Sequence, residues 1–306
     1  MHESLEGQRV IVTGATGLVG GPLSTALRSA GASVVAGARK RGGQGPMYWN
    51  GATGEIDGAP LEGAAAVVHL AGENIAGRRW SDSFKREIRD SRVKGTRLIA
   101  EAIARANDKP RTLVCASAIG YYGDRGDELL TESSPAGEDY LAEVCAQWEA
   151  ACQPARDAGV RVVNARIGVV LSAQGGALAK MLTPFKLGLG GKMGSGRQYM
   201  SWVTLEDVVG ALAFLVTHES VSGPVNVTAP AASTNAEFTR TLGRVLRRPT
   251  VFPVPAFAAR LAFGEMADAL LLASTRVAPR ALEGAGYRFR HGELEGALRQ
   301  VLGRRA

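Results

Sequence analysis

The chain has 306 residues, of which 45% are hydrophobic and 21% are charged, and its formal net charge is +7 at pH 7. This is the composition of a folded globular protein, with enough residues for one large domain or two modest ones. The longest apolar stretch, 261–273, is interrupted by Glu265 and Asp268, so the composition excludes a membrane-spanning helix.

The basic excess has two interpretations, a solvent-exposed surface rich in arginine or a site for anionic ligands. No basic run exceeds three residues and no aromatic-basic RNA-binding motif occurs, so we expect no nucleic-acid partner. Residues 1–6 contain no apolar signal segment, and Cys115, Cys145 and Cys152 form no Cys-x-x-Cys pair, so we expect a cytoplasmic protein with reduced thiols. The four histidines are scattered, and their spacing predicts no metal site.

A glycine-rich turn follows the first apolar stretch. Residues 10–12 predict a buried strand, residues 13–20 read Thr-Gly-x-x-Gly-x-x-Gly, and a helical pattern comes next. In this context Gly14 allows a tight turn, Gly17 lets the backbone approach a phosphate, and Gly20 lets the helix lie close to the sheet. The helix N-terminus adds partial positive charge, so the turn is predicted to hold the pyrophosphate of a dinucleotide. The expected cofactor contacts here are Gly14, Thr16, Gly17, Leu18 and Val19.

The second predicted strand, 33–38, ends at the cations of residues 39–41. In a dinucleotide-binding fold the end of this strand faces the adenosine ribose, where an acidic residue binds a free 2′-hydroxyl and an arginine accommodates a 2′-phosphate. No Asp or Glu occurs in residues 34–41, so we predict NADP(H) rather than NAD(H). Arg39 is the expected phosphate ligand because its planar fork suits a phosphate. A solvated turn is the alternative interpretation of these cations.

The third predicted strand, 64–72, ends in small residues that allow a cofactor to approach closely. Its end supplies four further expected cofactor contacts: Leu70, Ala71, Gly72 and Glu73. No carboxylate or nucleophile is evidently paired with His69, so we interpret it as a hydrogen-bonded residue at the strand end and not as a catalyst.

Strand and helix patterns keep alternating as far as residue 170. A helix is predicted over 81–107, a strand over 112–117, a helix over 139–158 and a strand over 160–170. This alternation predicts a parallel sheet with right-handed connections.

After Leu171 the sequence becomes rich in glycine and proline, with a helix expected inside 178–187 and strand-then-helix over 202–216. The predicted fold class is therefore α/β, a Rossmann-type parallel sheet with helices on both faces and a smaller C-terminal substrate lid. We assign residues 1–170, completed by about 200–228, to an NADP-binding domain. Residues 171–199 and 229–306 are assigned to the lid.

Several of these stretches resemble the extended short-chain dehydrogenases/reductases, through the turn at 13–20, Ser117 at a strand end and Asp207 after a later turn. More narrowly, the chain resembles an atypical branch, the NADP-binding epimerase-like family, described as nucleoside-diphosphate-sugar epimerase or cell-division-inhibitor-like. The stretches that carry this resemblance are 69–75, 79–80, 117–123, 148–149 and 194–202. The resemblance covers nearly the whole chain and implies a Rossmann core with an NADP site and a substrate cleft beneath the lid.

The wider superfamily uses a tyrosine as general acid/base and a lysine four residues later, which lowers the tyrosine pKa and holds the nicotinamide ribose, while a serine polarises the substrate oxygen. Ser117 fits the serine, and Tyr140 lies roughly where the tyrosine is expected, but Val144 stands at the lysine position. Aligning the helix on 148–149 instead gives Leu141 and Cys145. The usual dyad is missing, and a tyrosine without its lysine keeps a pKa of about 10, which makes it a poor base at neutral pH.

Three functions remain open. The first is an NADP(H)-dependent oxidoreductase or epimerase with a modified site, acting on a small substrate for which nucleotide sugars and other anions are candidates. The second is an NADP(H)-binding regulatory or redox-sensing protein without turnover, and the third, least supported, is an interaction module with a vestigial loop. The candidate catalytic residues are Ser117, Tyr121 and Tyr140, the candidate contact to the nicotinamide end is Cys145, and the candidate substrate contacts are Tyr122, Arg197 and Trp202. Aromatic packing is the alternative for the adjacent tyrosines, and an inert buried thiol is the alternative for the cysteine.

Overall fold

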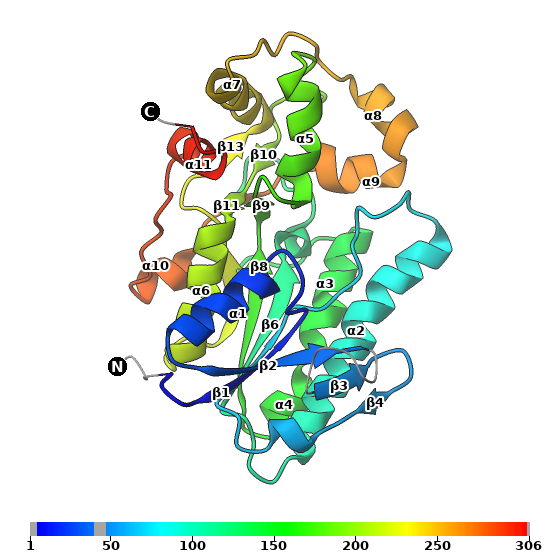
Figure 1. The fold of residues 1–306 in the computed structure, drawn as a ribbon. Helices are drawn as coiled ribbons and strands as arrows, with labels where there is room; N and C mark the ends of the chain where they lie inside the picture. Colours follow the sequence, from blue (N-terminus) through cyan, green and yellow to red (C-terminus); the bar gives the residue numbers. More distant parts are fainter. Residues whose placement is uncertain (1–4, 40–46, 305–306) are drawn as a thin grey trace.

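An eight-stranded sheet with the order β12-β8-β6-β5-β1-β2-β3-β4 forms the centre of the protein (Figure 1). The structure is a computed structural model that describes residues 5–39 and 47–304. The strands are β1 (Arg9–Thr13), β2 (Ser33–Ala38), β3 (Met47–Asn50), β4 (Glu55–Ile56), β5 (Ala66–His69), β6 (Thr112–Ala118), β8 (Arg161–Ile167) and β12 (Gly223–Val227). Neighbouring strands are parallel except β3 and β4, so the predicted α/β class and Rossmann-type sheet are confirmed.

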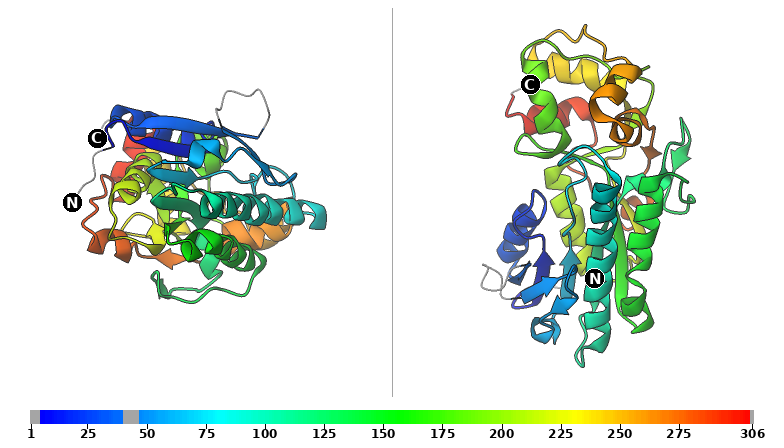
Figure 2. Two further views of the ribbon diagram at one scale, coloured as in Figure 1. Left: turned by 90° about the horizontal axis from the view of Figure 1, so that it is seen from below. Right: turned by 90° about the vertical axis from the view of Figure 1, so that its right-hand side faces the viewer.

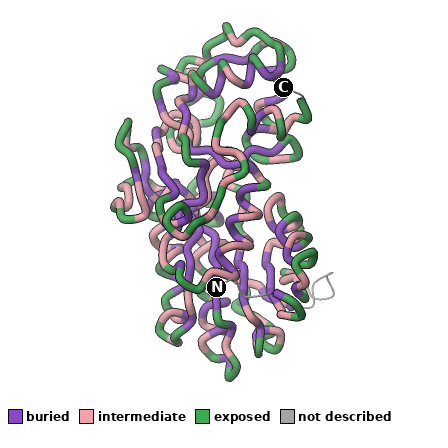
Figure 3. The backbone as a smooth tube through the Cα atoms, turned by 90° about the vertical axis from the view of Figure 1, so that its left-hand side faces the viewer, coloured by how far each residue is buried: buried purple, intermediate pink, exposed green. Residues whose placement is uncertain are grey.

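Helices cover both faces of this sheet (Figures 1 and 2). One face packs against α1 (Gly20–Ser29) and α6 (Leu205–Thr217), and the other against α2 (Asp82–Arg105), α3 (Tyr140–Ala150) and α4 (Gln153–Asp157). Side chains alternate along each strand, so Val10 and Val12 of β1 enter the first layer while Ile11 enters the second. Strands covered on both faces are apolar throughout, which accounts for the continuous hydrophobic runs in the sequence. Figure 3 shows buried residues gathered inside the molecule and exposed residues along its outline.

Capping side chains and a proline explain where the helices α2, α3 and α4 begin and where the helix after residue 139 is interrupted. The Ser81 hydroxyl accepts a hydrogen bond from the N–H of Phe84 at the start of α2, and the Asp139 carboxylate caps α3 by accepting from Ala142. The single helix predicted over 139–158 is wrong, because α3 ends at Ala150 and α4 starts at Gln153. Pro154 has no N–H to continue the helical ladder, so the helix restarts with this proline in its first turn.

The chain leaves the sheet after β8 and builds a second, smaller group of elements at one end of it (Figure 1). β9 (Val169–Leu171) pairs in parallel with β11 (Trp202–Thr204), and β10 (Tyr199–Met200) pairs with β13 (Ser233–Thr234). The helices here are α5 (Gly176–Lys186), α7 (Asn235–Leu246), α8 (Ala256–Phe263), α9 (Glu265–Ala267) and α11 (Leu294–Val301), while α10 (Arg280–Gly284) packs beside β12. Trp202, Phe238 and Leu182 belong to the core of this group. β7 (Leu129–Leu130) and β14 (Arg276–Val277) form a further parallel pair.

The buried Asp207 carboxylate fastens the C-terminal segment to α6. It accepts the backbone N–H of Arg290 at 2.8 Å and of His291 at 3.1 Å, and the hydroxyl of Thr204 at 2.9 Å. This aspartate therefore has a structural role between α6 and the segment that leads to α11.

Candidate functional site

The turn after β1 is folded so closely that its glycines have no room for a side chain. Gly14 has a φ of +69°, and a Cβ there would lie 3.1 Å from the backbone nitrogen of Ala71. A Cβ on Gly20 would lie only 2.1 Å from the carbonyl oxygen of Gly14, and the N–H of Gly17 donates to that same oxygen at 2.9 Å. The turn therefore brings the start of α1 directly against the end of β1.

The N-terminus of α1 has the properties of an anion site. Val19 precedes the helix without forming a side-chain cap, and the first turn contains no acidic residue. Side chains cap α2, α3, α6 and α7, whereas α4, α5 and α8 begin like α1, with neither a side-chain cap nor an acidic residue in the first turn. What distinguishes α1 is the glycine turn packed against its start. In the first turn of α1 the N–H of Gly21 donates to the carbonyl of Gly17 at 3.0 Å, and Pro22 has no N–H. The N–H groups of residues 18–20 and the partial positive charge of the helix end are therefore those available to a ligand, and the residues present fit a dinucleotide pyrophosphate.

The other expected cofactor contacts lie at the same edge of the sheet, because the carboxyl ends of parallel strands meet there. Arg39 directly follows β2 and is exposed, whereas the cations at 40 and 41 lie outside the described residues. After β5, the N–H of Leu70 donates to the hydroxyl of Thr13 at 3.2 Å. Ala71 lies against Gly14, and the N–H of Glu73 donates to Ser91 of α2. The loop 70–73 is thereby held beside the turn after β1.

On the lid side, Leu18 packs against the start of α5, where a Cβ on Gly175 would lie 3.3 Å from its side chain. Thr16 is exposed, and so is Arg197 in the loop before β10. Trp202 and Tyr122 are both fully buried. Both side chains fill the core in this structure, and their substrate contacts stay predictions.

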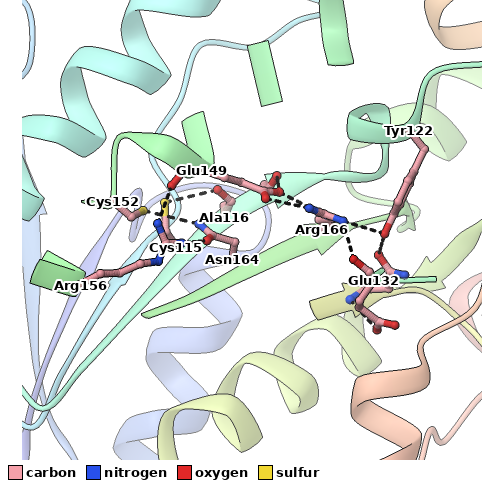
Figure 4. Close-up of polar contacts among 11 residues, drawn as sticks. Cys115, Ala116, Tyr122, Glu132, Glu149, Cys152, Arg156, Asn164 and Arg166 are labelled. Atoms are coloured by element: carbon pink, nitrogen blue, oxygen red, sulfur yellow. Dashed lines mark hydrogen bonds and ion pairs between the residues drawn. The ribbon is translucent and has the colours of Figure 1, made fainter. Parts of the chain in front are cut away.

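Ser117 is buried and joins a polar cluster with Glu149 of α3 and Arg166 of β8. Figure 4 shows Glu149 and Arg166 pointing toward one another. The hydroxyl of Ser117 donates to the Glu149 carboxylate at 2.7 Å. Arg166 binds both oxygens of that carboxylate, with Nε at 2.8 Å and a terminal nitrogen at 2.9 Å. The Ser117 hydroxyl thus donates its hydrogen bond to a carboxylate that Arg166 holds in a bidentate ion pair.

The two adjacent tyrosines pack around the same arginine. The guanidinium carbon of Arg166 lies 3.4 Å from the centroid of the Tyr121 ring. The hydroxyl of Tyr122 donates to Asn226 of β12 at 2.7 Å and accepts from Arg166 at 3.0 Å, and burial raises its pKa. Tyr122 is therefore a structural link between β6, β8 and β12, and Tyr121 stacks on the arginine at the partly buried edge of the cluster.

Tyr140 makes its hydrogen bond outside this cluster. Its hydroxyl donates to the backbone carbonyl of Lys85 in α2 at 2.5 Å, and burial raises its pKa. Cys145, one turn further along α3, is buried, and burial raises its pKa to about 12. The structure therefore does not join the candidate hydroxyls of Ser117 and Tyr140 into one acid/base unit, and the thiol is uncharged at neutral pH.

His69 is a buried strand-end residue, in keeping with its interpretation from the sequence. Its Nδ1 lies 2.7 Å from the hydroxyl of Thr13, and its ring packs edge-on against Trp49. Its Nε2 has no hydrogen-bond partner among the residues that the structure describes. Burial lowers its pKa from 6.5 to about 4. The imidazole is accordingly neutral at pH 7.

This burial predicts an acid-sensitive contribution to stability. Because the folded-state pKa lies below the unfolded value, the unfolded chain binds the proton more tightly, and stability falls as the pH drops from 6.5 to about 4. The loss amounts to about 3 kcal/mol. Urea unfolding of wild type and of His69→Gln at pH 7, 5.5 and 4 measures it, and the variant should lack this part of the pH dependence. If the free energy of unfolding fell equally with pH in both proteins, the assignment of this pH dependence to His69 would be contradicted.

Sequence reasoning did not identify Arg166 as a residue of the polar cluster with Ser117 and Glu149. A signal was available, since Arg166 stands between Ala165 and Ile167 in a predicted buried strand, where a charge requires a partner. Residues 5–39 and 47–304 contain no group of three or more His, Cys, Asp or Glu side chains suited to a metal ion. In that same part of the chain, no helix combines the length and apolar character needed to cross a bilayer.

Comparison with known proteins places the chain in a family. Residues 10–228 match the model of the NAD dependent epimerase/dehydratase family, and residues 254–301 match a domain of unknown function. The chain is 47% identical over 290 residues to epimerase family protein Mb2239 of Mycobacterium bovis, covering 94% of this chain and 96% of that protein. It is 37% identical to human epimerase family protein SDR39U1, covering 96% and 99% of the two chains.

Solved structures agree with this assignment. The crystal structure of human SDR39U1 with NADPH superimposes with a TM-score of 0.89 at 35% identity, over 97% of this chain and 99% of that one. A nucleoside-diphosphate sugar epimerase from Corynebacterium glutamicum gives a TM-score of 0.81 at 38% identity, over 99% of this chain and 59% of that longer one. The glycine-rich turn after β1 and the sheet order agree with these matches. The chain therefore belongs to the NAD dependent epimerase/dehydratase family, in its extended short-chain dehydrogenase-like, SDR39U1-type branch.

Proposed function

We propose that the protein binds NADP(H) along the carboxyl edge of its sheet. The observation that carries this proposal is the N-terminus of α1, which has no side-chain cap and no acidic residue and adjoins a turn too tight for any side chain at Gly20. Arg39 follows β2 as an exposed cation, where a 2′-phosphate requires one. The relative crystallised with NADPH shares this fold over nearly its whole length, which supports the same cofactor here.

Thermal unfolding with NADPH and with NADH tests the cofactor. A ligand that binds only the native state adds about 2.7 kcal/mol at 100 times its Kd, so NADPH should raise the Tm and NADH should raise it less. Arg39→Ala should weaken the binding of NADPH about tenfold or more, because a charge-assisted hydrogen bond is lost. The same variant should leave the binding of NADH unchanged. Equal shifts by both nucleotides would contradict the role of Arg39, and no shift by either would contradict the cofactor site itself.

We further propose that the protein is an oxidoreductase or epimerase acting on a small molecule. The family model describes epimerases and dehydratases, and the cofactor, when bound, supplies hydride transfer at its nicotinamide. The protein's own contribution is to hold that ring near the carboxyl ends of β5 and β6. The relative described as a nucleoside-diphosphate sugar epimerase makes nucleotide sugars the first substrates to test, and the exposed Arg197 near the lid suits an anionic group.

A second candidate is NADP(H) binding without turnover, as a regulatory or redox-sensing protein. It is favoured by the hydroxyls of Ser117 and Tyr140, whose protons go to Glu149 and to the Lys85 carbonyl instead of to a shared site. Following NADPH absorbance with nucleotide sugars, aldehydes and ketones separates the two candidates. Substrate-dependent oxidation supports the enzyme, whereas tight NADPH binding with no oxidation across these classes supports the binding protein.

We propose that the protein is cytoplasmic and that its partner is a small-molecule substrate. Cys115, Cys145 and Cys152 are buried free thiols, which suits a reducing compartment.

A further inference from the structure

Arg92 is a cation that α2 places between the loop after β5 and the middle of α3. One terminal nitrogen of its guanidinium donates to the carbonyl of Glu73 at 3.0 Å, and the other donates to the carbonyl of Ile88 at 3.0 Å. A Cβ on Gly72 would lie 3.5 Å from its central carbon. The guanidinium also lies over Trp148 of α3, 5.1 Å from the ring centroid. The arginine therefore touches the loop predicted to hold the cofactor.

Among the described residues, Arg92 donates no hydrogen bond to a carboxylate, although the negative charge of Glu73 acts on it from a distance. Its hydrogen-bond partners among the described residues are backbone carbonyls, and the side chain is partly buried. Withdrawing a guanidinium from water without an anion is unfavourable, and burial lowers the pKa of Arg92. An arginine in this condition beside a ligand loop is suited to bind an anionic or oxygen-rich ligand group.

The same cation lies over Trp148, one turn along α3 from Cys145. Burial raises the pKa values of Cys145 and Tyr140, and the positive charge of Arg92 acts on both groups in the opposite direction. Cys145 stands at the lysine position in the alignment on residues 148–149. A positive charge thus reaches this region from α2, although α3 contributes none.

We propose that Arg92 replaces the missing lysine as the cation that binds the ribose-phosphate part of NADP(H) on its nicotinamide side. The inference rests on the proposed NADP(H) site and adds a binding residue to it. Five N–H donors in a planar fork allow Arg92 to keep its hold on Glu73 while donating to a ribose or phosphate oxygen. The loop 72–73 and the cofactor would then be fixed by one side chain.

The test compares NADPH with adenosine 2′,5′-bisphosphate, which contains the adenosine half and the 2′-phosphate but no nicotinamide ribose. Isothermal titration of Arg92→Gln should show a Kd for NADPH that is raised about tenfold or more. The Kd for the bisphosphate should stay unchanged within about twofold. Arg39→Ala should weaken both ligands. The matched control is Arg97→Gln, on the same helix but exposed and paired with Glu101, and it should change neither affinity.

Two results would overturn the inference. Unchanged NADPH affinity in Arg92→Gln would show that the arginine does not reach the cofactor. Equal weakening of NADPH and the bisphosphate would show that Arg92 only supports the loop through Glu73. Neither result is confused with failure of the proposed function, because that failure would already appear as absent NADPH binding in the wild-type protein.

A second variant separates cofactor binding from loop support. Cys145→Lys, added to Arg92→Gln, returns a cation to the lysine position of α3 while the contact with Glu73 stays broken. Recovery of NADPH affinity by the double variant supports a charge that acts on the cofactor. Unrecovered NADPH affinity, with bisphosphate binding intact as proof of folding, counts against it.

Discussion

Gly20→Ala should both destabilise the protein and abolish strong NADPH binding, although alanine is the better helix former. A Cβ at this position would lie 2.1 Å from the carbonyl oxygen of Gly14 and 3.1 Å from the Cα of Ala15. These are backbone atoms of the turn, so α1 has to move away from β1 to admit the methyl group. Overpacking of this kind costs about 1–3 kcal/mol, which exceeds the gain of about 1 kcal/mol in helix propensity.

Displacing α1 also moves the N–H groups proposed to hold the pyrophosphate, so the Kd for NADPH should rise about tenfold or more. Gly21→Ala is the matched control, because its Cβ would make an ordinary contact of 3.5 Å with the carbonyl oxygen of Ala15. That variant should be as stable as wild type or slightly more so and should bind NADPH normally. Urea unfolding and isothermal titration measure both effects. Normal binding by Gly20→Ala would show that the turn is looser than its geometry indicates.

The sheet was predictable because each of its central strands is covered on both faces. Residues 10–12, 66–68 and 112–117 form uninterrupted apolar or small-residue runs, and the glycines after β1 mark the turn that follows. Gly31, with a φ of +90°, ends α1 just after its last turn, where a glycine is expected. These signals are local, so the sequence contains them in full.

What the sequence did not reveal depends on contacts between distant residues. Ser117 was expected to face a substrate, yet its hydroxyl meets Glu149, 32 residues further along the chain. Trp202 was expected in the substrate cleft, yet it lies on the side of β11 that fills the lid core. In each case the residue type suits either role, and only the direction of the side chain decides between them.

The position of the missing dyad lysine illustrates the same limit. Two alignments of α3 were possible from the sequence, one placing Val144 and one placing Cys145 at the lysine position. Both are buried apolar or uncharged side chains in the structure. The nearby cation belongs to α2, and a search for a spacing within one helix does not find a residue on another.

Glu149→Gln should cost about 3–5 kcal/mol of stability, because it leaves Arg166 as a buried charge without its counter-ion. The side chains of Arg166 and Glu149 are only 3% and 13% exposed, and two parallel hydrogen bonds join them. The amide also presents N–H donors to the guanidinium and to the Ser117 hydroxyl, where acceptors are required. The Glu149 carboxylate joins Ser117 of β6 and Arg166 of β8 to α3, so its replacement removes contacts near the carboxyl ends of both strands.

A comparison with an exposed ion pair shows why burial decides this outcome. Glu101→Gln removes the partner of Arg97 on the surface of α2, where the side chains are 39% and 57% exposed, and should cost at most about 1 kcal/mol. Replacing both buried partners, as in Glu149→Gln with Arg166→Met, should cost less than the sum of the single changes, because no unpaired charge remains. Urea unfolding of the four variants measures these differences. Additive costs for the double variant would mean that Arg166 is stabilised by Tyr121, Tyr122 and the Glu132 carbonyl and not by the carboxylate.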